Sequence, residues 1–428
     1  MEESSLTTRT GAFWQWLDRW LYLQPGYTEW LRRLTGLCGL PIGVIIWTWT
    51  QGGPGPYIVP AWRIKDCLLY LPLPPPFINM TVFVAYGLCC GALVLGSKQK
   101  FFAALPAIVL AYYGSRDWMS AGFHFDVLLW IMFIALLFDQ PGRNPCRRII
   151  QISVAACYFY AALSKLLYPD FISGCSFEAI FNNGLAFGPS WVELIKQHPI
   201  TRSWWLIFSW LTIAVEFFFP IALFIKKTRL VALISAIAFH TGISIFLDPF
   251  LFNFTAVICS GLLAFVDKKG EDEKTLALDW SSARKKIQAA LAFAFCLFLV
   301  LFPARDYILP ERPLAEMTGF DRSPWGFCMY LQCLETTAFD LDYLTDDGVW
   351  HKFPSQGRMK RGYTDNEVYA AAHYIFDTVP SATEVRVRLQ LCINHHICRE
   401  KTLVAKRNVA PGKIQIRTFA MPAPAPRV

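Results

Sequence analysis

One lysine interrupts a long apolar stretch near the middle of the chain. Lys165 is the only lysine or arginine between Ile149 and Tyr168, and an ammonium group near the hydrocarbon region of a bilayer is costly. If burial removes its proton, the neutral amine can act as a general base. A lysine near the end of a span can instead extend its stem and place the ammonium among the lipid headgroups. Position along the chain leaves both interpretations open.

The residues around this lysine favour an inward orientation. Tyr158 and Lys165 are seven residues apart and therefore lie on one face of a helix. Ala161 and Ala162 lie on the same face, and such small residues are typical of contacts between membrane helices. We therefore expect this face to pack against another helix.

Four further ionisable residues are expected at a similar depth: His124, Asp126, Glu216 and His240. Each has a simple structural interpretation. A histidine can be a hydrogen-bonded core residue, Glu216 can pair with a basic or hydroxyl group, and Asp126 can cap a helix. The clustering of two histidines, one lysine and two carboxylates at one depth favours a functional site over these separate explanations.

The sequence carries no signature of several common enzyme classes. It lacks the His-Glu-x-x-His spacing of zinc enzymes, a nucleophile elbow, a P-loop and a Gly-rich dinucleotide fingerprint. The segment Cys392-Ile393-Asn394-His395-His396-Ile397-Cys398 contains metal-ligand residue types, but a disulfide or a strand and turn explains it better. We therefore expect no metal, and the sequence argues against common hydrolases and nucleotide-dependent enzymes.

The composition is that of a membrane protein. Apolar residues make up 54% of the chain and charged residues 17%, and the mean hydropathy is +0.35. Aromatic residues reach 16% and include 16 tryptophans, as expected where rings lie among headgroups. Basic loops that orient membrane helices explain the net charge of +8. The expected partner is therefore the lipid bilayer and not nucleic acid.

Apolar segments predict an all-α polytopic membrane bundle of about nine transmembrane helices. They cover residues 34–50, 80–96, 101–114, 124–138, 149–168, 204–225, 229–247, 249–266 and 287–302, near the length of about 17–25 residues that crosses a bilayer. Lysine and arginine are enriched in segment 1–33 and in the loops after the second, fourth, sixth and eighth segments. By the positive-inside rule, we expect a cytoplasmic or interfacial segment at 1–33 and a transmembrane domain at 34–302. The rest is expected on the outer side, in an ER lumen or a bacterial periplasm.

The chain after the last span predicts a small domain of a different kind. Residues 385–391 alternate between apolar and polar types, as a half-buried strand does, and Glu367–Phe376 has a helical pattern. We therefore expect an extracytoplasmic α+β domain at 303–420 and a disordered tail at 421–428. The cysteines on the predicted outer side, where disulfides can form, are Cys67, Cys175, Cys328, Cys333, Cys392 and Cys398. Their pairing and the oligomeric state stay open.

Several short segments resemble vitamin K-dependent γ-glutamyl carboxylase and its bacterial relatives, which form the horizontally transferred transmembrane (HTTM) domain family. Tyr158–Leu166 resembles the segment that holds the family's catalytic lysine, and Phe123-His124-Phe125 resembles the segment that holds its catalytic histidine. Phe239-His240 matches a second Phe-His pair within a span. Further similar segments lie at 66–74, 91–96, 319–329 and 389–398. The resemblance extends over roughly residues 15–405 and rests on the order and spacing of short motifs.

The resemblance implies a quinol-dependent membrane carboxylase and epoxidase. Lys165 is then expected to deprotonate reduced vitamin K, whose reaction with O2 gives a base strong enough to remove a γ-proton from a glutamate of a peptide or protein substrate. CO2 adds to the carbanion, with His124 assisting, and the quinol becomes its epoxide. The residues expected to line the quinol and substrate pocket are Phe123, Asp126, Tyr158, Ala162, Glu216 and His240.

Three features depart from the family pattern. Phe123 stands where the family typically has an asparagine that contacts the quinol. In animal members the cysteine that matches Cys67 bonds to a lumenal cysteine, and Ala372 occupies the matching position here. The outer region is also much shorter than in animal members. Two alternatives therefore stay open: a related quinol or lipid oxidoreductase that does not carboxylate protein, and a non-catalytic membrane protein that binds lipid or serves as a scaffold.

Overall fold

The computed structural model describes residues 12–14, 16–17, 20–21, 27–50, 57–58, 69–70, 74–116, 124–139, 145–182, 200–246, 251–267, 283–308, 334–353, 372, 375–393, 397–409 and 415–420. Most of these residues are helical. The helices are α2 (Thr28–Thr50), α3 (Pro76–Val94), α4 (Phe101–Arg116), α6 (His124–Leu137), α7 (Pro145–Leu166), α8 (Pro169–Ile172), α9 (Cys175–Asn182), α11 (Arg202–Ala222), α12 (Arg229–Phe246), α13 (Leu251–Leu262), the 3₁₀ turn η1 (Leu263–Phe265) and α14 (Ala283–Ile308). Every predicted apolar segment overlaps one of them.

Four helices among the described residues are long and apolar enough to cross a membrane: Pro76–Val94, Pro145–Leu166, Arg202–Ala222 and Lys285–Ala304. Shorter apolar helices cover Phe101–Tyr113, Val127–Leu137, Arg229–Ile245 and Asn253–Phe265. Large apolar side chains such as Leu88, Leu211 and Leu301 are exposed on the long helices, as expected where lipid is the solvent. The chain is therefore a helical integral membrane protein, and nine crossings remain a prediction.

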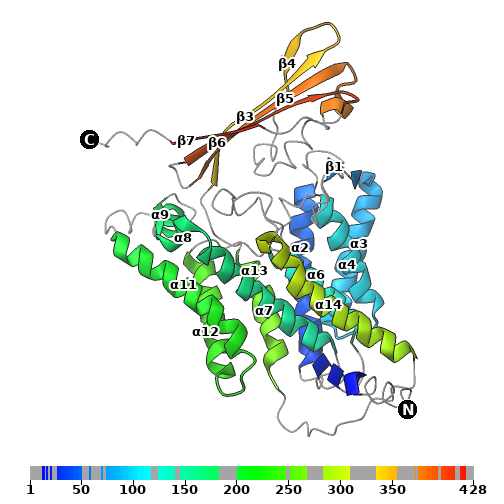
Figure 1. The fold of residues 1–428 in the computed structure, drawn as a ribbon. Coiled ribbons are helices and arrows are strands. Elements are labelled where there is room, and N and C mark those ends of the chain that lie inside the picture. Colours follow the sequence, from blue (N-terminus) through cyan, green and yellow to red (C-terminus); the bar gives the residue numbers. More distant parts are fainter. Residues whose placement is uncertain are drawn as a thin grey trace, which may run out of the picture.

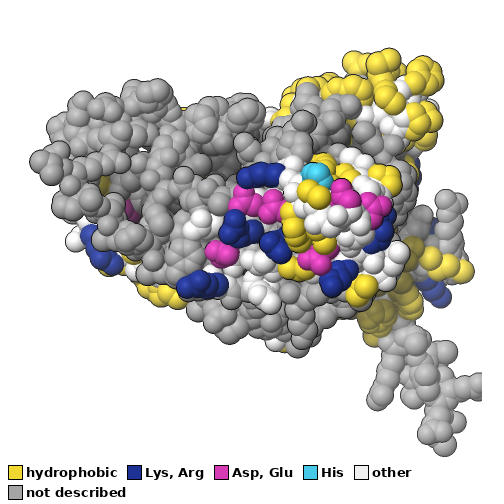
Figure 2. Space-filling view, turned by 90° about the horizontal axis from the view of Figure 1, so that it is seen from above, with side chains coloured by type: hydrophobic (Ala, Val, Ile, Leu, Met, Phe, Trp, Pro, Cys, Tyr) yellow, Lys and Arg dark blue, Asp and Glu magenta, His cyan; other side chains and the backbone are white. Residues whose placement is uncertain are grey.

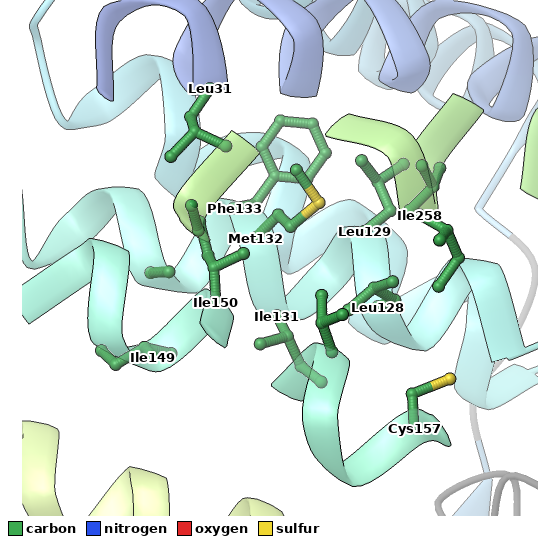
Figure 3. Close-up of a cluster of buried hydrophobic side chains, with 14 of the residues drawn as sticks. Leu31, Leu128, Leu129, Ile131, Met132, Phe133, Ile149, Ile150, Cys157 and Ile258 are labelled. Carbon is green, nitrogen blue, oxygen red and sulfur yellow. The ribbon is translucent and has the colours of Figure 1, made fainter. Parts of the chain in front are cut away.

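The centre of the bundle is formed by α6, α7, α2 and α13. Figure 3 shows the apolar side chains that meet there, among them Leu128 and Phe133 of α6, Ile150 of α7 and Ile258 of α13. Five successive or near-successive residues of α6, from Leu128 to Phe133, are fully buried. A helix that is apolar on all sides lies either among other helices or in lipid, and the burial of these residues shows that α6 is enclosed by other helices. Burial on every side explains why so short an apolar helix is held in place.

Close packing of α2 on α3 depends on a small residue. A Cβ atom at Gly36 would lie 2.5 Å from the carbonyl oxygen of Cys90 and 2.9 Å from Cβ of Leu93. Backbone atoms cannot move aside as the end of a long side chain can. Glycine at this position therefore allows the two helices to approach closely, as small residues do between membrane helices.

At the start of α7, an arginine joins three elements of the bundle. Arg147 donates from Nε to the carbonyl oxygen of Ala264 at 2.5 Å and from Nη2 to that of Val266 at 2.9 Å. It also pairs with Asp267 at 2.6 Å, and Arg229 of α12 pairs with the same carboxylate at 2.5 Å. Partial burial raises the pKa of the Asp267 carboxyl, but the two arginines outweigh this effect and hold that pKa below its usual value.

The described strands form two antiparallel sheets. A small one pairs β1 (Tyr57–Ile58) with β2 (Leu69–Tyr70). The larger has the order β4-β3-β5-β6-β7, from β3 (Leu334–Thr345), β4 (Trp350–Lys352), β5 (Ala382–Ile393), β6 (Ile397–Lys406) and β7 (Gln415–Ala420). Figure 1 shows this sheet at one end of the helices, the end near β1, α8 and α9, with the described residues that precede α2 at the other end.

One face of the larger sheet is buried and the other is charged. Val385, Val387 and Leu389 are fully buried against Ile375 and neighbouring apolar residues, which confirms the alternation predicted for this strand. Of the predicted helix at Glu367–Phe376, only Ala372 and residues 375–376 lie among the described residues, and they are helical. On the open face, Asp340 pairs with Lys352 and Arg388. Figure 2 shows basic and acidic side chains next to one another at this end of the molecule.

Candidate functional site

A buried ion pair joins α7 to α11. Nζ of Lys165 lies 2.8 Å from both Oε1 and Oε2 of Glu216, and the two side chains are 3% and 4% exposed. The interpretation in which Lys165 reaches the lipid headgroups is therefore wrong, because its ammonium points into the protein. The interpretation of Glu216 as the partner of a basic group is confirmed.

The sequence just after Lys165 explains how the chain closes over it. The residue before a proline disfavours the helical conformation, and Tyr168, which precedes Pro169, is extended with φ −106° and ψ 111°. Helix α7 therefore ends at Leu166, and the chain turns into α8. This turn brings the Phe171 ring to 5.7 Å from Lys165 Nζ, within reach of a cation–π interaction.

Glu216 lies on the buried stripe of an otherwise lipid-facing helix. The buried residues of α11 are spaced by three or four positions and include Ser209, Ile213, Glu216 and Phe219. The opposite side carries exposed apolar residues such as Leu211. This spacing is that of an amphipathic helix whose polar groups point away from lipid. The hydroxyl of Ser209 is buried on the same stripe and has no hydrogen-bond partner among the described residues.

A second polar pair lies beside the first. Tyr158 OH and His240 Nε2 are 2.8 Å apart, and the Nδ1 atom of His240 is buried without a hydrogen-bond partner in the described part of the chain. Thr255 of α13 donates to the carbonyl oxygen of His240 at 2.9 Å, and its hydroxyl is 2.5 Å from that of Ser244. These bonds fix the backbone around the histidine to the neighbouring helix.

The two pairs belong to one site. Tyr158 and Lys165 lie on the same face of α7, and the Tyr158 ring is 5.0 Å from that of Phe219 on α11. Phe219 follows Glu216 by one helical turn, so the α7–α11 contact carries both the aromatic and the ionic partner.

The described geometry suits acid–base chemistry in the absence of water. Both side chains of the ion pair are almost fully buried, and exclusion of water strengthens electrostatic interactions inside a site. The Phe171 ring lies over the Lys165 ammonium, and the rings of Tyr158 and Phe219 pack together further along the same α7–α11 contact.

The structure brings only part of the predicted site together. Tyr158, Lys165, Glu216 and His240 meet as described, and Ala162 is fully buried on the same helix. His124 and Asp126 lie in the first turn of α6, but their side chains are outside the described residues. Phe123 is outside them altogether. The roles of His124, Asp126 and Phe123 therefore remain predictions.

The cysteine predictions have a similar outcome. Cys175 is a free thiol, with Arg202 Nη2 3.8 Å from its sulfur. Cys67, Cys328 and Cys333 lie outside the described residues. Strands β5 and β6 pair with Cys392 directly opposite Cys398, although the two side chains are outside the described part.

Sequence reasoning missed three residues that complete the site. Phe171 belongs to a four-residue helix, which is too short to show a helical pattern. Phe219 could have been predicted from the sequence, because it lies one turn after Glu216 on the same face. Thr255 contacts the histidine backbone through a pairing of α12 with α13 that no local pattern reveals.

Two further findings concern the function of the site. Within the described residues, no group of three histidine, cysteine, aspartate or glutamate side chains is arranged to hold a metal ion. Comparison of the chain with protein-family models, with curated proteins and with solved structures found no match. The functional argument therefore depends on the site itself.

Proposed function

We propose that this chain is a quinol-dependent membrane carboxylase and epoxidase of the vitamin K type. The observation that carries the proposal is the buried Lys165–Glu216 pair. A buried ion pair is a poor stabilising device, because the loss of hydration offsets much of its attraction. In a membrane helix such a pair is by default a functional-site hypothesis, and here the Phe171 ring lies 5.7 Å from its ammonium.

A reduced naphthoquinone fits the groups around this pair. Its fused rings need apolar and aromatic neighbours, which Phe171, Tyr158 and Phe219 supply. Its hydroxyl group needs a donor and an acceptor, which the ammonium and carboxylate groups of the pair supply side by side. As a lipid-soluble molecule, it reaches such a site through the bilayer.

The residues of the chain hold the ligand hydroxyl, remove its proton and exclude water. The bound quinol, after reaction with O2, supplies the strong base that a γ-proton of glutamate requires, and CO2 is captured by the resulting carbanion. Lys165 and Glu216 act at the hydroxyl, while Tyr158 and His240 form the adjacent hydrogen-bonded wall. His124 is proposed to assist at the carbanion, from the resemblance of its segment to the family.

The proposal includes an orientation in the membrane. The basic loops place the N-terminus in the cytoplasm by the positive-inside rule. Nine crossings then leave the sheet domain in an ER lumen or a periplasm. In support, the described residues that precede α2 and the larger sheet lie at opposite ends of the helices in Figure 1. Lys165 lies in the last turn of α7, so a glutamate-containing peptide meets the quinol by approaching from the sheet end.

Activity of the purified protein tests this proposal. The protein in lipid nanodiscs is incubated with reduced vitamin K, O2, labelled bicarbonate and a glutamate-rich peptide. We expect label in the peptide and an equal amount of vitamin K epoxide. Folded protein that yields neither product would refute the proposed function.

Two tyrosines of α7 provide a matched pair of variants. Tyr158→Phe removes the hydroxyl that bonds to His240 and is expected to lower turnover. Tyr160→Phe removes a hydroxyl that instead bonds to the carbonyl oxygen of Val300 on α14, away from the site. Turnover is expected to stay close to wild type in this control. Equal loss in both variants would mean that the helix and not the site is affected.

A quinol oxidoreductase that does not carboxylate protein is the second candidate. The described groups act at the quinol hydroxyl, and this first step is common to both functions. The same assay separates them: oxidation or epoxidation of the quinol at a rate that added peptide does not change, with no label in the peptide, would favour the second candidate.

A further inference from the structure

The geometry of the ion pair limits which of its groups can accept a proton. An ammonium group has three N–H donors and no lone pair, so Lys165 cannot take up a proton while it is the cation of this pair. A carboxylate offers about four lone-pair positions, and Lys165 Nζ occupies two of them at 2.8 Å. The pair is therefore left with acceptor positions on Glu216 and one N–H on Lys165.

We infer that Glu216 is the proton acceptor for a hydroxyl acid bound at this site and that Lys165 stabilises the anion that forms. The inference rests on the proposed function for its ligand class, a hydroxylated naphthalene. In the step, the ligand O–H bond breaks and the proton bonds to a carboxylate oxygen of Glu216. The electron pair stays on the ligand oxygen. Glu216 becomes neutral as the ligand becomes negative, and Lys165 keeps its positive charge throughout.

This assignment keeps the number of buried charges constant. The Lys165–Glu216 pair is exchanged for a pair of Lys165 with the ligand oxygen, and no charge is left alone. If a neutral Lys165 were the base beside an ionised Glu216, the site would hold an unpaired buried carboxylate before the proton transfer. After the transfer it would hold three buried charges: the Lys165 ammonium, the Glu216 carboxylate and the ligand anion. An uncompensated ion is strongly unfavourable at a site where both side chains are at most 4% exposed.

The groups that face the pair do not take over either role. Among the described residues, the titratable ones are Cys157 and Tyr158 on α7 and His240 on α12. Tyr158 and His240 are hydrogen-bonded to each other, so neither competes with Glu216 for the ammonium. On the α8 side, the uncharged ring of Phe171 lies over Lys165.

Two variants separate the roles of the two residues. Lys165→Arg keeps a cation that can bond to a carboxylate with two N–H groups, but arginine does not lose its proton in proteins and cannot act as a base. Glu216→Gln keeps the size of the side chain and an oxygen for Lys165, but removes the basic carboxylate. Asp139→Asn is the matched control, because Asp139 pairs with the buried Arg32 at a different place in the bundle.

The readout is the ionisation of a bound probe and does not require turnover. The probe is 1-naphthol, which has the acidic hydroxyl of a naphthoquinol but lacks the second hydroxyl needed for oxidation to a quinone. Its protonated and deprotonated forms differ in absorbance. The spectrum of bound 1-naphthol is recorded at pH 7 for the full chain in nanodiscs, and the protons released to a weakly buffered solution on binding are counted with a pH indicator. Binding is measured separately, and folding is checked by circular dichroism.

We expect bound naphtholate in the wild type, in Asp139→Asn and in Lys165→Arg, with no proton released to the buffer, because Glu216 keeps the proton. In Glu216→Gln, naphtholate still pairs with the Lys165 ammonium, but one proton is released for each naphtholate bound. The inference is overturned if folded Lys165→Arg binds only protonated naphthol, or if Glu216→Gln forms naphtholate without releasing a proton, since Lys165 is then the base. Wild-type protein that binds no naphthol, or only its protonated form, also overturns it. Naphtholate without carboxylation would instead refute only the proposed function.

Discussion

Replacing the members of the ion pair one at a time and then together is expected to give opposite effects on stability. Lys165→Met leaves the Glu216 carboxylate buried without its partner, and Glu216→Leu leaves the Lys165 ammonium in the same position. Removing one member of a buried pair costs about 3–5 kcal/mol, while replacing both by apolar residues of similar size is often neutral or stabilising. With exposures of 3% and 4%, solvent can rehydrate neither group without unfolding.

The measurement is a double-mutant cycle on the protein in detergent. Thermal unfolding is followed by intrinsic tryptophan fluorescence for the wild type, both single variants and the double variant. Each single variant is expected to unfold at a lower temperature and the double variant close to the wild type. With losses of about 3–5 kcal/mol in each single variant and almost none in the double variant, the coupling energy is about 6–10 kcal/mol. Losses that simply add in the double variant would show that the two side chains do not interact in the membrane-embedded protein.

Three further predictions follow from other parts of the structure. Gly36→Ala is expected to destabilise the bundle by about 1–3 kcal/mol, because the new Cβ meets the backbone of Cys90 at 2.5 Å; an unchanged melting temperature would contradict this packing. The Asp267 pKa is held below its usual value of 3.8, so its contribution to stability is complete above that value and is lost as the pH falls through the lower folded-state pKa. Asp267→Asn should flatten this acid limb of the stability curve. Cys392 and Cys398 are opposite each other across β5 and β6, and we expect a disulfide between them that stabilises the sheet by about 2 kcal/mol. Peptide mass maps recorded without reductant should show the linked peptides; free thiols at both positions after oxidative folding would contradict this prediction.

The helical framework could be predicted from hydropathy alone, and the reason is physical. Lipid-facing and fully buried helices both need long apolar runs, so α7 and α11 are visible in the sequence. Hydropathy does not distinguish the two environments. The short apolar segment of α6 looks like a weak span, yet residues such as Phe133 are fully buried. Enclosure by other helices depends on tertiary packing, which local sequence does not encode.

The site was predictable in its residue types and less so in its pairing. A charge at membrane depth must find a partner, and this requirement singled out Lys165, Glu216 and His240. Glu216 was expected to pair with some basic or hydroxyl group, but the choice of Lys165, 51 residues away, depends on how α7 packs on α11. The bond between Tyr158 and His240 joins residues 82 positions apart and depends on the same packing.

An experimental map of the protein with reduced vitamin K bound under anaerobic conditions tests the central claim most directly. The account predicts a naphthalene ring beside Phe171 and Tyr158, with one hydroxyl oxygen within hydrogen-bond distance of both Lys165 Nζ and a Glu216 carboxylate oxygen. A quinol bound elsewhere, with both 2.8 Å contacts of the Lys165–Glu216 pair intact and no ligand oxygen near them, would contradict it.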